Sequence, residues 1–194
     1  MSKSDPNIAK KERNKTIRWV VTIFFVTILI SGTISFASDS LMANSSMLVA
    51  FIILLAIILI GILFDVIGVA VTSADEKPFH SMAARKVPGA QESIRLLRNA
   101  ERVSSICNDV VGDICGVVSG SASATIAVQV LNNFELSLES VIPLVMSALV
   151  AGLTVGGKAV GKTFAVHSCT NIVHGVGKII WAFRRFFQKT KTRK

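Results

Sequence analysis

The sequence predicts an all-α protein, a polytopic membrane bundle of about four transmembrane helices with additional cytoplasmic amphipathic helices. Hydrophobic residues make up 51% of the 194 residues and charged residues 17%, which is more apolar material than one small soluble core normally uses. The apolar residues also gather in four long stretches, each close to the roughly 20 residues that cross a hydrocarbon layer about 30 Å thick. The basic residues lie between these stretches in an alternating pattern.

The first two stretches, residues 16–37 and 47–71, are almost uninterrupted, with Asp65 as the one charged residue well inside them. A basic segment precedes the first stretch, and small residues stand at Ser35 and Ala37. A cleaved signal peptide shows the same pattern, and cleavage after Ala37 would leave three spans in the same orientation. We expect an uncleaved anchor.

The third and fourth stretches, residues 103–130 and 141–165, are less apolar. We predict membrane spans here too, in place of soluble helices, because both are long and follow two strongly apolar spans. Their most polar residues are Asn108, Asp109, Asp113, Lys158 and Lys162.

Basic residues predict the orientation, since Lys and Arg near a span tend to stay on the cytoplasmic side. Six lie before or at the start of the first span, six between the second and third, and nine from Lys158 onward. The connections SDSLMANSS and LNNFELSLES contain none. We therefore predict a multi-pass protein of the plasma membrane with both termini in the cytoplasm. The net charge of +9 is then explained by the lipid bilayer as partner, and no nucleic acid is expected.

The chain divides into three parts on this interpretation. Residues 1–44 form a basic tail and the first anchor, residues 45–187 form the main transmembrane domain, and residues 188–194 form a basic tail. A cytoplasmic helical insert is expected at about 74–103. Near the end of the domain, aromatic and basic residues around Trp181 predict an amphipathic helix at the membrane surface.

Catalytic chemistry is not indicated by any motif. The segment GGKAVGKT, residues 156–163, fits the phosphate-loop pattern, but that loop follows a buried strand in an α/β domain, and here it lies at the end of a span. We interpret it as a chance match. Since no histidine is placed to activate a serine or cysteine, we predict that the protein is not an enzyme.

Ionisable residues inside the predicted spans are the candidate functional residues, because a charge in hydrocarbon is costly unless it is paired, hydrated or bound to an ion. Carboxylate, amide and hydroxyl oxygens are hard ligands suited to Mg²⁺. The candidate metal ligands are Asp65, Asn108, Asp109, Asp113 and Ser105. Lys158 is the candidate ion-pair or gating residue. We expect these residues to share a cytoplasm-facing cavity, with Mg²⁺ as a transported ion and no tightly bound cofactor.

Two interpretations of this set stay open. It forms a pathway for a cation or proton, or it forms an internal salt-bridge network in which Lys158 pairs with aspartates and locks the helices together.

Three segments resemble the transmembrane domain of the CNNM/CorC (CorB, DUF21-like) family of magnesium and cobalt transport proteins. FDVIGVAVTSAD (64–75) resembles the family's FFSxxETAL(x)SA segment. AQESIRLLRNAERVSSICNDVVGD (90–113) resembles its amphipathic helix, NPER-like turn and next membrane helix. GKAVGKTFA (157–165) resembles its GEILPKTLA segment. The likeness covers about residues 45–187.

The resemblance implies a divalent metal cation transporter, or a transporter-like protein, that forms a homodimer. Asp65 and Gly68 stand at the family's SxxE serine and glutamate, and Lys158 replaces a glutamate that helps to hold the ion. The CBS and CorC-type domains that usually follow this unit do not occur in the sequence, so a separate CBS-containing regulator is an expected partner. The alternative is a non-transporting membrane scaffold or regulatory subunit with a structural Asp–Lys network.

Overall fold

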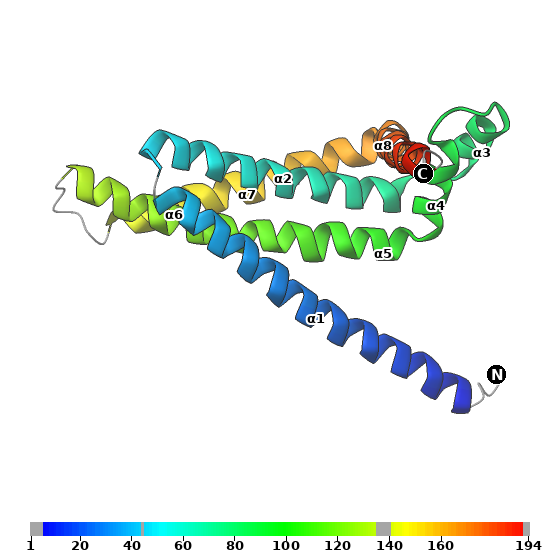
Figure 1. Cartoon of the computed structure of the whole chain (residues 1–194), viewed down its shortest axis with the longest axis horizontal. Helices are drawn as coiled ribbons and strands as arrows, with labels where there is room; N and C mark the ends of the chain where they lie inside the picture. The colour runs from blue at the N-terminus through cyan, green and yellow to red at the C-terminus, as the bar shows by residue number, and fades with distance from the viewer. Residues whose placement is uncertain (1–5, 44, 135–140, 192–194) are drawn as a thin grey trace.

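A computed structural model shows an all-helical protein (Figure 1). It describes residues 6–43, 45–134 and 141–191, and these contain no strand. The elements in chain order are α1 (Pro6–Ala43), α2 (Met47–Ser73), α3 (Lys77–Ala84), α4 (Ala90–Arg98), α5 (Ala100–Ser105), the π-helix η1 (Ile106–Gly112), α6 (Asp113–Phe134), α7 (Val141–His167) and α8 (Cys169–Lys191). The predicted fold class is confirmed.

Four candidate spans are long and apolar enough to cross a membrane, which indicates a membrane protein. They are Thr16–Met42, Met47–Ser73, Ala100–Leu131 and Val141–His167. The third is assembled from α5, η1 and α6.

The predicted connection SDSLMANSS is mostly helical, because α1 continues through Ala43. This segment contains neither proline nor glycine, so nothing in its backbone ends the helix earlier. Most of the second predicted connection, LNNFELSLES, lies outside the described residues, as do residues 1–5 and 192–194 of the predicted tails.

Helix α2 lies at the centre of the bundle and packs against both α6 and α7. Its buried residues recur every three or four positions, as expected for one face of a helix. They include Ala50, Leu54, Ile58, Gly61, Asp65 and Gly68.

The glycines of α7 allow it to approach α2 closely. A methyl group at Gly157 would collide with Ile62 of α2, and one at Gly161 would lie 2.8 Å from Val66. These two glycines therefore permit tight packing of α7 against α2.

Helix α1 is held less firmly. Gln129 donates to the Met42 carbonyl at 3.0 Å, and Ser121 donates to Asp39 at 3.3 Å, both near the C-terminal end of α1. Toward its N-terminus α1 diverges from the other helices (Figure 1). A pocket between the early turns of α1 and helix α5 is lined by residues of both helices.

In contrast to the N-terminal half of α1, helices α3, α4 and α8 pack together at one end of the bundle. Helix α8 runs across the direction of α2 and α7 (Figure 1). Ser93 of α4 donates to the Val173 carbonyl of α8 at 3.2 Å, and Arg184 lies 3.8 Å from Glu92. Helices α3 and α4 lie between the second and third candidate spans, where a helical insert is predicted.

Candidate functional site

The site is centred on Asp65, a carboxylate buried in the middle of the bundle. Its side chain is 4% exposed. Lys158 Nζ lies 3.5 Å from Asp65 Oδ2, and Lys162 Nζ lies 4.0 Å from the same oxygen. The two lysines are four residues apart on α7, so they occupy one face of that helix. Two ammonium groups from α7 thus compensate one carboxylate from α2.

A backbone carbonyl from a third element completes this centre. Lys158 donates to the Gly112 carbonyl oxygen at 3.4 Å. A methyl group at Gly112 would lie 2.6 Å from Asp65 Oδ1 and 3.3 Å from Lys158 Nζ. Only a residue without a side chain leaves room for the carboxylate and the ammonium here. We call Asp65, Lys158, Lys162 and Gly112 the ionic centre.

Gly112 ends the π-helix η1, whose seven residues form one wide turn inside the third span. π-Helical turns are rare and occur frequently at functional sites, since they displace the backbone relative to an α-helix. In this chain the wide turn brings backbone and side-chain groups of the third span against α2 beside Asp65. The predicted α-helical register of the third span is therefore interrupted next to the ionic centre.

Asn108, a predicted ligand, lies in the same turn. Its amide nitrogen donates to Ser104 Oγ at 3.1 Å, while its amide oxygen is buried without a hydrogen-bond partner. That amide packs against Gly68, where a methyl group would collide with it. Gly68 follows Asp65 by three residues, so the unpaired oxygen of Asn108 lies about one helical turn from the carboxylate.

Asp109 and Asp113 do not join this centre within one chain. Both are exposed, and the described residues contain no group of three acidic, histidine or cysteine side chains that could hold a metal ion. The inward face of this segment is taken by Val110, Ile114 and Val118, which form an apolar cluster with Ile23 and Ile57. The expected cavity of three aspartates is not assembled in the described part of the chain.

Ser105, the fifth candidate ligand, is also elsewhere. It lines a cleft between α1 and α5 together with Arg102 and Trp19. Of the predicted residues, the structure therefore brings Asp65 and Lys158 into contact, places Asn108 one turn away, and leaves Ser105, Asp109 and Asp113 apart.

The exposed fraction of the side chain rises from Asp65 through Lys158 to Lys162. The side chains of Asp65, Lys158 and Lys162 are 4%, 20% and 54% exposed. The ionic centre is therefore buried at the carboxylate and open at its outer lysine.

Two oxygen groups converge on the Lys158 ammonium in this centre. A carboxylate and a backbone carbonyl are both hard oxygen donors, the type that binds Mg²⁺. Here they hold the Lys158 ammonium. The lysine supplies the positive charge that the buried carboxylate requires.

Two participants were not among the predicted site residues. Lys162 stands one turn beyond Lys158, a spacing visible in the sequence that indicates a shared face. The Gly112 carbonyl gives no comparable signal, because only the π-turn brings it to Lys158. The phosphate-loop match, residues 156–163, lies wholly within the α7 helix and forms no loop.

No family model, curated protein or solved structure matches this chain. The likeness to the CNNM/CorC family therefore stays a prediction that depends on the three segments quoted above.

Proposed function

We propose that this chain is a divalent metal cation transporter, or a transporter-like membrane protein, in which a magnesium-type ion reaches the pocket around Asp65. One observation carries the proposal. The Lys158 ammonium lies between a buried carboxylate and a backbone carbonyl, which are oxygen donors of the kind that accept a hard cation. The lysine occupies the position of the ion in the resting protein.

Transport in this scheme is an exchange of cations at Asp65. Mg²⁺ dehydrates reluctantly, keeps several waters and binds through one or two carboxylates, so a single aspartate beside a carbonyl suffices for a partly hydrated ion. The entering ion displaces Lys158, whose long side chain swings toward the more exposed position of Lys162. The return of Lys158 to Asp65 releases the ion.

Ion-dependent thermal stability tests this proposal, because a ligand that binds only the folded state stabilises it. The detergent-purified protein is titrated with Mg²⁺, with Ca²⁺ and Na⁺ as comparison ions. We expect a saturable increase in Tm with Mg²⁺, at lower concentration in Lys158→Met and absent in Asp65→Asn. Asp75→Asn, at an exposed aspartate in the connection after α2, is the matched control and should respond like the wild type.

A second candidate function is a non-transporting scaffold or regulatory subunit, in which the ionic centre only holds helices together. It is favoured by the presence of two lysines at one carboxylate. A wild-type Tm that does not respond to millimolar Mg²⁺ would support this function against transport, whereas destabilisation of Asp65→Asn is expected for both functions.

We also propose that the protein is a homodimer. Asp109 and Asp113 are exposed within a candidate span, where contact with lipid tails is costly for a charge. On the same helix nothing lies within 4 Å of a methyl group built at Gly116 or Gly120, so another helix has room to approach. Stepwise photobleaching of singly labelled protein in nanodiscs should show two bleaching steps, and predominantly single steps would contradict the dimer.

The orientation and membrane follow as part of the same proposal. We propose that both termini lie in the cytoplasm, which the distribution of Lys and Arg between spans supports, and that the membrane is the plasma membrane. Reporter fusions at each terminus that are active only in the cytoplasm should both be active.

A further inference from the structure

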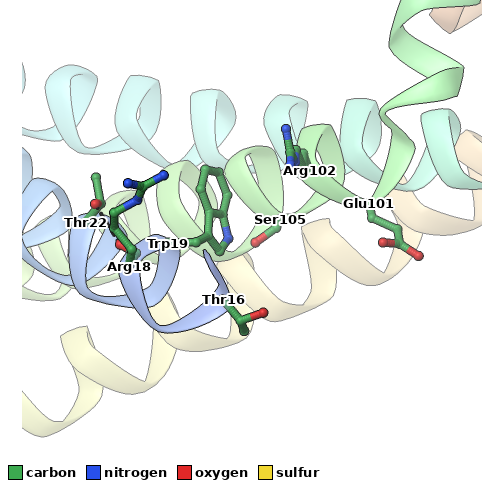
Figure 2. Close-up of a pocket in the computed structure, with 7 residues that line it drawn as sticks. All are labelled: Thr16, Arg18, Trp19, Thr22, Glu101, Arg102 and Ser105. Atoms are coloured by element: carbon green, nitrogen blue, oxygen red, sulfur yellow. Dashed lines mark hydrogen bonds between the residues drawn. The ribbon is translucent and has the colours of Figure 1, made fainter. Parts of the chain in front are cut away.

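A polar cleft lies between the early turns of α1 and the start of the third span. Its volume is about 550 Å³. Figure 2 shows the Trp19 ring standing between the α1 residues and those of α5. The lining side chains that matter here are Arg18, Trp19 and Thr22 from α1, and Glu101, Arg102 and Ser105 from the third span.

The residues that line the cleft carry a surplus of positive charge. The cleft contains two guanidinium groups and one carboxylate. Within the described residues, neither arginine forms an ion pair with Glu101 or with any other acid. The Arg102 guanidinium lies 5.8 Å from the centre of the Trp19 ring, a cation–π contact that leaves its N–H groups available to an anion. An anionic ligand would complete this arrangement.

The position of the cleft indicates where that anion comes from. The candidate spans Thr16–Met42 and Ala100–Leu131 both begin within the residues of the cleft or next to them. Span ends lie at the level of lipid headgroups, where tryptophan is enriched. The next residues of α1 are apolar and exposed, with Val20 58%, Val21 47% and Phe24 60% exposed. A phospholipid with its phosphate in the cleft would thus have its acyl chains along the apolar surface of α1.

We propose that this cleft binds the headgroup of an anionic phospholipid, with Arg18 and Arg102 bonding its phosphate and Trp19 packing against its glycerol region. A guanidinium presents paired N–H donors that match phosphate oxygens. The lipid fills the cleft between α1 and α5, on the side where α1 diverges from the other helices (Figure 1), and so holds the N-terminal half of α1 in place. This site does not involve the ionic centre and stands independently of the transport proposal.

The fluorescence of Trp19 reports lipid binding in this test. The chain contains two tryptophans, so Trp181→Phe leaves Trp19 alone. In this background, the full-length protein in neutral detergent is titrated with brominated phosphatidylglycerol, and quenching of Trp19 is followed. Brominated phosphatidylcholine is the neutral comparison lipid, and inorganic phosphate is the soluble comparison anion.

We expect saturable quenching by the anionic lipid at concentrations at which phosphatidylcholine has little effect. Removing the charge-assisted hydrogen bonds in R18Q/R102Q should raise the half-quenching concentration at least about tenfold. R95Q/R98Q removes the same charge from exposed arginines of α4 outside the cleft and should leave it unchanged. Circular dichroism of both variants confirms that the helices are retained.

Three results would overturn the assignment: equal quenching by the two lipids, equal loss in the two double variants, or full competition by millimolar inorganic phosphate. The last would identify a site for soluble anions in place of a lipid site.

Discussion

Two charged regions of the protein differ in how their charges are compensated. In the ionic centre, Asp65 is buried and two lysines lie within 4.0 Å of it. In the cleft between α1 and α5, Arg18 and Arg102 are exposed and line a polar space without ion pairs among the described residues. Burial enforces pairing inside the protein, because an isolated charge there is costly. Charges at a membrane surface can instead take their partner from outside.

Loss of the buried carboxylate should have the largest effect on stability. Asp65→Asn leaves the Lys158 ammonium between amide and carbonyl oxygens without a counter-charge. Breaking a buried pair by removing one partner costs about 3 kcal/mol or more. We expect a decrease of this size in the free energy of unfolding, measured by denaturant titration in a defined detergent micelle.

A double variant sharpens this expectation. Asp65→Leu/Lys158→Met removes both charges of the closest pair and replaces them with apolar side chains of similar volume, which is often neutral for stability. Lys162 is 54% exposed and can extend to solvent. The double variant should recover most of the stability lost in Asp65→Asn. If it is as unstable as the single variant, the pair is not the cause of the loss.

Alanine substitutions at two glycines of the third span should differ in their effect on stability by an intermediate amount. Gly112→Ala places a methyl group 2.6 Å from Asp65 Oδ1, and overpacking of this kind costs about 1–3 kcal/mol. At Gly116 the added methyl group meets nothing within 4 Å. Gly116→Ala should therefore be neutral, or stabilising by up to about 1 kcal/mol through helix propensity. Thermal unfolding followed by circular dichroism measures both, and equal destabilisation would contradict the geometry of the ionic centre.

The sequence predicted the fold well because its signals are local. Apolar length predicted the four spans, and α2 begins at the predicted residue, Met47. Tight packing at Gly157 and Gly161 was also predictable, since small residues four apart lie on one helix face. The ends of α1 were predicted less well, because no residue marks where a helix leaves the membrane.

The candidate site was predicted only in part. Asp65 and Lys158 stand out as charges in apolar stretches, and the structure joins them. The outward position of Asp109 and Asp113 follows from the π-turn and from Val110 packing inward. The Gly112 carbonyl contact likewise depends on backbone geometry. The spacing of residues in the sequence predicts neither the extra residue of a π-turn nor a contact made by a backbone carbonyl.

An ion pair with one exposed partner should matter less than the pair at Asp65. Arg184 Nη1 lies 3.8 Å from Glu92 Oε1, and the two side chains are 52% and 11% exposed. Because the guanidinium reaches solvent, we expect a contribution within the range of surface pairs, about 0.2–1 kcal/mol. Arg184→Gln should therefore lower the free energy of unfolding by about 0.5 kcal/mol, and 1 M NaCl should reduce the difference because exposed charges are screened.

The smallest change is expected at Asp113, which is exposed in contrast to Asp65. Asp113→Asn should alter the free energy of unfolding of the detergent-solubilised monomer by less than about 0.5 kcal/mol, as surface substitutions usually do. A loss as large as that of Asp65→Asn would show that Asp113 belongs to the buried network.

Ion flux tests the central claim most directly, namely that a cation exchanges with Lys158 at Asp65. Purified protein is reconstituted into liposomes loaded with a magnesium-sensitive dye, and Mg²⁺ entry is followed after external addition. We expect entry with the wild type and with Arg184→Gln, and none above empty liposomes with Asp65→Asn. Equal entry with Asp65→Asn, or no entry with correctly folded wild type, would contradict it.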